Sequence, residues 1–178
     1  ENTDLVPVNQ ADIIERVIIA GDLSKLQPAD RVNYYRATCD SLGLNPLTKP
    51  FDYIVLNGKL VLYALRACTE QLRTIHGVWV DELAESEREG VFIVTAKVKN
   101  ADGRTDMAKG AVSIKGMTGE TLANALMKTE TKAKRRATLS ICGLGILDET
   151  EIETVPSARP FVEGAVGAKS DTPVSFKK

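Results

Sequence analysis

Lysine and arginine residues recur at helical spacing between positions 128 and 136 of this sequence. They form its most concentrated group of basic side chains. Lys128, Lys132 and Arg136 follow one another at intervals of four residues, and Arg135 stands beside the last of them. On a helix with about 100° per residue these four side chains share one arc of roughly 100°. Their charges then lie about 5 to 6 Å apart along the axis, comparable with the phosphates of a nucleic-acid strand. Such a row suits a sugar-phosphate backbone and not a base edge.

The charge balance around this row favours an external anion. Like charges at i, i+4 repel each other by a few tenths of a kcal/mol per pair. Glu130 is the only acid between residues 121 and 140 that could offset this repulsion. Lys132 and Arg135 are predicted to point outward. The alternative is a plain solvated helix face, and Lys134 and Leu139 interrupt the pattern of charged and apolar faces.

Neighbouring elements offer further cations, namely Lys59, Arg66, Arg73, Lys97, Lys99 and Lys109. Lys97 and Lys99 share one face of a predicted strand, because side chains alternate with period two. Arg66 and Arg73 lie at i, i+7 on a predicted helix. These side chains either extend the basic row or belong to ordinary surface.

The net charge of the 178-residue chain is only −1, but the charges are segregated. Residues 81–90 hold five acids, and Asp148, Glu149, Glu151 and Glu153 follow the basic row without any base among them. A near-neutral total therefore conceals a concentrated basic segment.

The three cysteines are odd in number and far apart, which argues against a disulfide framework and favours a reducing cytosol. No apolar run approaches the roughly 20 residues that span a bilayer.

The elements that must position these cations begin with a helical region over residues 1–45. Apolar spacing predicts a helix over residues 11–20, and a second helix runs from Pro28 to near Gly43, where a left-handed cap is easiest for glycine. Residues 51–64 predict a hairpin around Asn57-Gly58, the dipeptide that accepts the positive φ angles of a type I′ turn. A helix over residues 65–75 follows.

The remaining elements complete a β-β-α-β-β-β-α order. We expect a strand over residues 78–83, a second hairpin from residues 91–99 and 104–114, and a long helix over residues 120–142. Its apolar residues Leu122, Leu126, Ala133, Ala137 and Ile141 can face a sheet. The sequence thus predicts an α+β fold with a mainly antiparallel sheet and helices on one face. Its core spans residues 46–155, and residues 156–178 form a flexible tail.

Catalytic chemistry finds little support, and we predict no catalytic residue, metal or cofactor. His76 is the single histidine, and Glu130-Thr131-Lys132 resembles a nuclease motif that belongs on a strand, whereas here it falls in a helix. The acids at residues 148–153 either bind a divalent ion, form a solvated turn, or contact the basic surface of another subunit. The chain has only nine aromatic residues, and burial is expected for Phe51, Tyr53, Tyr63 and Trp79. That argues against a base-stacking platform.

A combination of motifs resembles a known family. Residues 43–49, Gly-Leu-Asn-Pro-Leu-Thr-Lys, enter a hairpin, and a helix, a second hairpin and the basic helix follow. The basic helix ends in residues 141–152, Ile-Cys-Gly-Leu-Gly-Ile-Leu-Asp-Glu-Thr-Glu-Ile. Over residues 28–155 this pattern resembles the phage single-strand annealing recombinases of the lambda Red beta and RecT type.

The resemblance implies a protein that binds one DNA strand in a basic groove and pairs it with its complement without ATP. It implies a ring-forming or filament-forming homo-oligomer in the bacterial cytoplasm, with a phage exonuclease and the host single-strand binding protein as further partners. The residues that match the family's groove by position are Lys97, Lys109, Lys128, Lys132, Arg135 and Arg136. Two alternatives stay open, a metal-dependent nuclease or other DNA-processing enzyme, and a structural adaptor whose basic helix meets an acidic protein.

Overall fold

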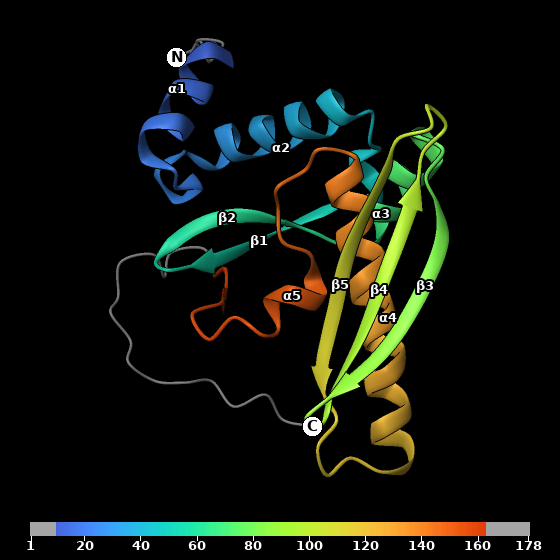
Figure 1. Ribbon diagram of the computed structural model, residues 1–178. Helices are drawn as coiled ribbons and strands as arrows, with labels where there is room; N and C mark the ends of the chain where they lie inside the picture. Colours follow the sequence, from blue (N-terminus) through green and yellow to red (C-terminus); the bar gives the residue numbers. More distant parts are fainter. Residues whose placement is uncertain (1–9, 163–178) are drawn as a thin grey trace, which may run out of the picture.

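A computed structural model describes residues 10–162 and opens with two helices (Figure 1). Helix α1 (Gln10–Ala20) is joined through the 3-10 turn η1 (Leu23–Lys25) to α2 (Pro28–Leu42). Pro28 occupies the first turn of α2, and Gly43 closes it in the left-handed conformation with φ 68°. Both predicted helices are confirmed. The bounds of α2 could be predicted because a proline start and a glycine stop act locally in the chain.

The first hairpin pairs β1 (Phe51–Leu56) with β2 (Lys59–Ala64) after a short 3-10 turn, η2 (Pro46–Thr48). Asn57 and Gly58 have φ 50° and 77°, as the predicted two-residue turn requires. A third strand, β6 (Arg159–Pro160), pairs with the other edge of β1. The predicted tail therefore starts too early: residues 156–162 return to the sheet, and residues 163–178 lie outside the described chain.

The second sheet contains β3 (Trp79–Arg88), β4 (Val91–Lys99) and β5 (Thr105–Ser113) in antiparallel order. Strand β3 is longer than the predicted strand over residues 78–83, and its acidic half runs as an exposed edge strand. Glu89 and Gly90, with φ 52° and 77°, make a second tight hairpin turn into β4. Charged side chains are tolerated on an edge strand because one of its sides faces water.

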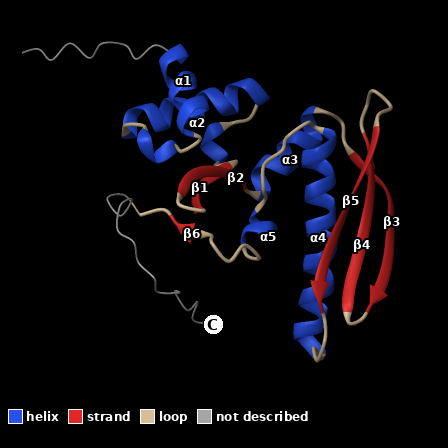
Figure 2. Ribbon diagram, turned by 60° about the vertical axis from the view of Figure 1, so that its left-hand side comes forward, coloured by secondary structure: helices blue, strands red, loops and turns tan. Residues whose placement is uncertain are grey.

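The α+β class is confirmed, but the strands form two three-stranded sheets instead of one. Helices α3 (Arg66–Ile75) and α4 (Gly119–Ile141) stand between them, as Figure 2 shows. Leu139 of α4 is buried with Phe51 of the first hairpin and Cys68 of α3, which holds the two sheets apart. This contact explains why Leu139 interrupts the apolar pattern of its own helix.

Helix α4 lies flat on the second sheet through a row of small residues at i, i+4 spacing. Ala125, Thr129, Ala133 and Ala137 are all buried, and the last two pack with Val94 and Val98 of β4 and the adjacent core residues. The predicted contacts of Ala133, Ala137 and Ile141 are confirmed. Leu122 and Leu126 are only half-buried, because the helix meets the sheet along its small residues.

Gly110 of β5 permits this close approach. A Cβ at position 110 would lie 2.3 Å from the carbonyl oxygen of Thr129 and 2.8 Å from the amide nitrogen of Ala133. Both are backbone atoms of α4, so neither can turn aside. The rotation of α4 about its own axis, and with it the direction of each of its cations, is therefore fixed at this crossing.

A short helix, α5 (Glu149–Ile152), lies beside α4 and precedes β6 in the chain. No helix within residues 10–162 is both long and apolar enough to cross a membrane.

The three cysteines are thiols. Burial raises the pKa of Cys68 to about 12 and raises the pKa values of Cys39 and Cys142 above their ordinary range, so all three are poor nucleophiles at neutral pH.

Replacing Gly110 by alanine should destabilise the fold by about 1 to 3 kcal/mol, the usual cost of overpacking an interior. Denaturant unfolding of Gly110→Ala against the parent chain measures this loss. Gly145→Ala is the matched control, because a Cβ there meets no atom within 4 Å and needs no positive φ. Equal stability of the two variants would contradict the proposed role of Gly110.

Candidate nucleic-acid interface

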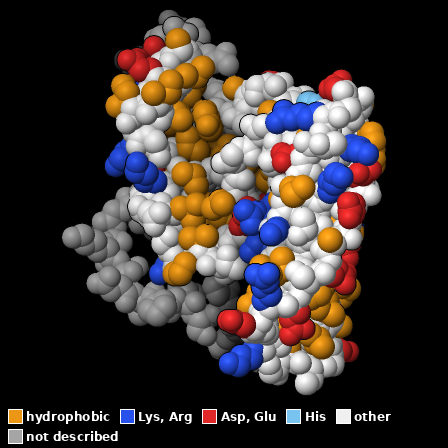
Figure 3. Space-filling view, viewed as in Figure 1, with side chains coloured by type: hydrophobic (Ala, Val, Ile, Leu, Met, Phe, Trp, Pro, Cys, Tyr) orange, Lys and Arg blue, Asp and Glu red, His pale blue; other side chains and the backbone are white. Residues whose placement is uncertain are grey.

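The cations of α4 point into three different surroundings. Lys128, Arg135 and Arg136 meet the acids that follow the helix, Lys134 faces α3, and Lys132 lies beside β5 with its Cβ next to Gly110. In Figure 3, Lys and Arg side chains run down the middle of the molecule over α4 and β5, with acidic side chains among them. The basic row thus exists on the surface, but its members are not equivalent.

Residues 148–153, here called the acidic segment, bind one side of the α4 row. Lys128 donates to Glu153, Arg135 donates to Glu149, and Arg136 Nε lies 3.0 Å from Glu151 Oε1. The expectation that Glu130 alone offsets the row is therefore wrong. The offsetting carboxylates come from 14 to 25 residues further along the chain, and only the fold brings them back onto the helix.

Asp148 anchors the acidic segment. Its Oδ1 accepts hydrogen bonds from the amides of Thr150 and Glu151, each at 3.0 Å, and the Glu151 side chain accepts from the Asp148 amide in return, which makes a capping box. Its Oδ2 accepts no hydrogen bond from any described residue, and Arg135 Nη1 lies 3.9 Å away. The Asp148 side chain is 1% exposed and that of Arg135 is 15% exposed. The prediction that Arg135 points outward is therefore wrong, because it serves as counter-ion to this carboxylate.

The lysines of the second sheet lie on the face away from α4. Ala96 and Ala108 are cross-strand partners that pack toward α4, so Lys97 and Lys109, one position further along each strand, point to the opposite face. Lys97 and Lys99 contact Asp81, with Lys99 Nζ 2.9 Å from Asp81 Oδ1. The predicted continuous basic track is thus divided between two faces of the second sheet. The two parts approach each other at the β5 edge, where Arg136 Nη1 donates to the Lys109 carbonyl oxygen at 3.0 Å.

A polar cleft between α3 and α4 collects the other cations. It has a volume of about 310 Å³, and its lining is Arg66, Thr69, Glu70, Arg73, Thr131, Lys134, Arg135 and Thr138. Arg66 and Arg73 share this side of α3, as their i, i+7 spacing predicts. Four cations converge here against one lining carboxylate, so the cleft can hold an anion.

The cations of the cleft differ in how well they are neutralised. Arg66 Nε lies 3.8 Å from Glu70 Oε1 on the surface, and Lys134 donates to Glu130 one turn before it. Arg73 has no acidic partner among residues 10–162, which makes it the clearest unpaired charge of the cleft. The sequence reading left Lys134 out of the site, because Lys134 lies outside the arc of the other α4 cations. The sequence signal that could have pointed to Lys134 was the presence of basic residues on both α3 and α4.

The remaining residues considered from the sequence lie elsewhere. Lys59 sits at the first hairpin turn, with its Nζ near Gly21 and far along the chain from α4. His76 is the exposed residue that ends α3. Phe51 is buried, as expected, whereas Tyr53 and Tyr63 are only half-buried and Trp79 is 47% exposed. The expected burial of Trp79 is wrong, because its neighbours Val78 and Val80 face the core and alternation turns Trp79 outward on an edge strand.

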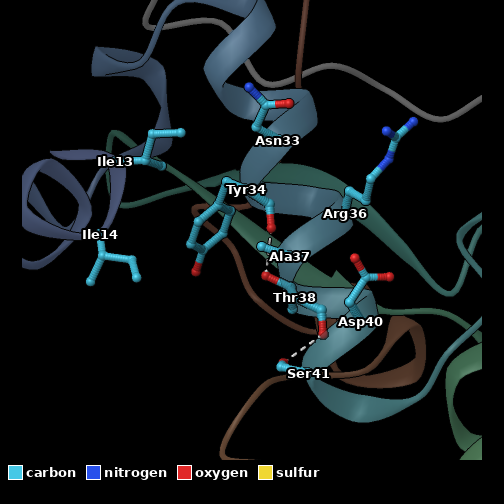
Figure 4. A pocket seen from close by; sticks show the side chains of 9 residues that line it. All are labelled: Ile13, Ile14, Asn33, Tyr34, Arg36, Ala37, Thr38, Asp40 and Ser41. Carbon is cyan, nitrogen blue, oxygen red and sulfur yellow. Dashed lines mark hydrogen bonds between the residues drawn. The ribbon is translucent and has the colours of Figure 1, made fainter. Parts of the chain in front are cut away.

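Two larger pockets do not collect cations. The pocket between β1 and the segment after α5 has a volume of about 920 Å³, and its charged lining is Asp52, Glu149 and Glu153 against one cation, Arg159. The pocket between α1 and α2 has a volume of about 780 Å³, and Figure 4 shows Ile13 and Ile14 of α1 across from Tyr34 of α2. Its lining includes one cation, Arg36, and one carboxylate, Asp40. This pocket suits apolar contacts and not a polyanion. The α3–α4 cleft is therefore the best anion site that the described residues provide.

No protein-family model matches the chain, and no curated protein sequence is significantly similar to it. The acids considered as metal ligands are engaged with cations and with the α5 cap. No group of three or more His, Cys, Asp or Glu side chains within residues 10–162 is arranged to hold a metal ion.

Replacing Arg135 by alanine should lower the free energy of unfolding by about 1 to 3 kcal/mol, because the buried Asp148 carboxylate loses its counter-ion. Lys132→Ala should change it by less than about 0.5 kcal/mol, because no ion pair or side-chain hydrogen bond joins Lys132 to the described residues. Urea unfolding of the two variants measures both values. If both variants keep the parent stability, Arg135 does not support Asp148.

Proposed function

We propose that this chain binds single-stranded DNA through the sugar-phosphate backbone and anneals complementary strands without ATP, in phage homologous recombination. The observation that carries the proposal is the convergence of Arg66, Arg73, Lys134 and Arg135 on the α3–α4 cleft. A phosphodiester is the biological anion that repeats at the spacing of such cations, and guanidinium groups match phosphate oxygens in pairs.

The composition of the cleft favours backbone binding without sequence preference. Threonine hydroxyls and charged groups line it, and no aromatic ring does. Annealing requires that the protein hold the backbone while the base edges stay available for pairing, whereas an aromatic platform would occupy the base faces. Lys132 lies two residues before Lys134, about 200° around the helix, and therefore adds its charge on the β5 side of α4 instead of lining the cleft.

The order of elements also supports the proposal. A hairpin, a helix, a three-stranded sheet and a long basic helix follow one another, in the order that the resemblance to the lambda Red beta and RecT type implies. Homo-oligomeric rings or filaments, a phage exonuclease and the host single-strand binding protein are proposed partners on the same ground, as is the bacterial cytoplasm. Ile18 and Ile19 of α1, 76% and 77% exposed, give a homo-oligomer an apolar surface to bury.

A second candidate is an adaptor that binds an acidic protein. One observation favours it: three cations of α4 already bind carboxylates within this chain. A nuclease has less support, because the carboxylates it would need are bound to these cations and to the α5 cap.

An annealing assay separates the three functions. Complementary oligonucleotides are mixed with the protein without ATP and in the presence of EDTA, and duplex formation is followed by fluorescence quenching. We expect pairing to be faster than in the protein-free control. Cleaved product that needs a divalent metal would support the nuclease, and no effect on either strand would leave the adaptor.

Replacing Arg73 and Lys134 together by alanine should weaken binding of a labelled oligothymidylate without unfolding the protein. Each lost phosphate contact makes the slope of log K against log salt shallower by about 0.7, so two make it shallower by about 1.4 and lower the affinity at 0.1 M salt by about 25-fold. Fluorescence anisotropy over a salt series measures both quantities.

The control for this experiment is Arg88→Ala, which removes an exposed cation from the end of β3. It changes the net charge without touching the cleft. If Arg88→Ala weakens binding as much per charge as the cleft variant does, the effect is one of net charge and the cleft is not the binding site.

A further inference from the structure

The acidic segment lies on α4 in the manner of a bound strand. Its carboxylates Glu149, Glu151 and Glu153 alternate along the chain, and each contacts a different cation of the helix, namely Arg135, Arg136 and Lys128. Carboxylate and phosphate oxygens accept the same charge-assisted hydrogen bonds from guanidinium and ammonium groups. Each α4 cation in this contact is therefore a preformed anion site whose present occupant belongs to the protein itself.

The fold delivers this segment to the helix in a defined position. The amide of Ala64 donates to the Leu147 carbonyl oxygen at 2.8 Å, and Ala64 forms an isolated parallel bridge with Asp148. The Asp148 capping box then orders the single turn of α5. The segment is thus anchored at its start on the first hairpin, while Glu149 and Glu153 beyond the anchor lie at the surface and Glu151 is partly covered.

Each of the three ion pairs has one or both partners at the surface. The Lys128 and Glu153 side chains are 41% and 59% exposed; in the other two pairs Arg136 is 45% exposed against 16% for Glu151, and Glu149 is 37% exposed against 15% for Arg135. Water and salt reach the exposed partner of each pair and screen its charge, most of all in the Lys128–Glu153 pair. Asp148, in contrast, is buried and stays with Arg135. The segment can therefore release its glutamates from α4 without loss of its anchor.

We propose that the acidic segment occupies phosphate sites on α4 and competes with single-stranded DNA for Lys128, Arg135 and Arg136. This inference rests on the proposed function, since it names the regulation of the same basic surface. When a strand enters from the α3–α4 cleft, its phosphates replace the glutamates one by one, because Arg135 belongs to both the cleft and the segment contact. Binding then costs the displacement of an internal anion, which keeps the grip on the strand reversible.

The test compares two variants with equal change in net charge. Glu149→Gln, Glu151→Gln and Glu153→Gln are combined in the first, and Gln at position 151 still completes the capping box. Glu85→Gln, Glu87→Gln and Glu89→Gln are combined in the control; these side chains are exposed on β3 and its turn and take part in none of the ion pairs with α4. Anisotropy of a labelled oligothymidylate over a salt series is measured for both and for the parent chain.

We expect the segment variant to bind at least about tenfold more tightly than the control variant at 0.1 M salt. Its slope of log K against log salt should be steeper by about 2, since three further cations become available at about 0.7 each. A segment variant that binds like the control overturns the inference and leaves the proposed function standing. If none of the three proteins binds the oligonucleotide, both fail, and binding by the segment variant alone supports displacement.

Glu153→Gln alone guards against misfolding of the triple variant, because Glu153 caps the end of α5 through its backbone, and its side chain forms an ion pair with Lys128 alone among the described residues. It should steepen the slope by about 0.7. Hydrogen exchange gives an independent readout in the parent chain: if the glutamates are displaced, DNA should speed exchange of amides 153 and 154, which bond to the Glu151 carbonyl oxygen, while amides 150 and 151 stay bonded to Asp148. Unchanged or slower exchange at amides 153 and 154, with the oligonucleotide bound, overturns the inference.

Discussion

The crossing of α4 over β5 at Gly110 is the contact on which the arrangement of charges depends. Backbone meets backbone there, because the carbonyl oxygen of Thr129 occupies the space that any Cβ would need. A helix held this closely cannot rotate, so its small residues face the sheet and its other sides have fixed neighbours. Lys134 then faces α3, Lys128 and Arg136 face the acidic segment, and Arg135 stands between the two. The position of one glycine thus sorts the cations of the helix into separate groups.

The charge of this chain is segregated in the sequence and partly recombined by the fold. The acids of β3 meet the lysines of β4, and the acidic segment meets α4. Among the cations that line the α3–α4 cleft, Arg73 is the one without a carboxylate partner in residues 10–162, and Lys132 beside β5 has none either. A net charge of −1 is therefore compatible with a local anion site. Under the proposed function, a polyanion that reaches this surface exchanges with the carboxylates paired to Lys128 and Arg136.

These two features suit a protein that must hold a strand and also let it go. A row of unpaired lysines and arginines would bind a polyanion tightly and keep it, whereas cations already bound to carboxylates bind it by exchange. The absence of aromatic rings from the cleft lining points the same way, because nothing there competes for the base faces. Annealing needs both properties, since the strand must be ordered for pairing and then released as duplex.

The sequence by itself determined most of the helices and strands, but not α5, β6 or the second half of β3. The Asn57-Gly58 turn, the Pro28 start and Gly43 stop of α2, and the bounds of α4 within one residue depend on neighbours in the chain, and all are present. The sequence also located the cations of the cleft, except Lys134. These features are local, because turn conformations and helical periods are set over a few residues.

Only the tertiary structure decided which charge meets which. The contact of residues 148–153 with α4, the burial of Arg135 against Asp148, the outward face of Trp79 and the separation of Lys97 and Lys109 from the helix face depend on how distant elements pack. So does the division of the strands into two sheets around Leu139. Periodicity tells which side chains share a face, but it does not say what that face will lie against, and for a charged group the neighbour decides the function.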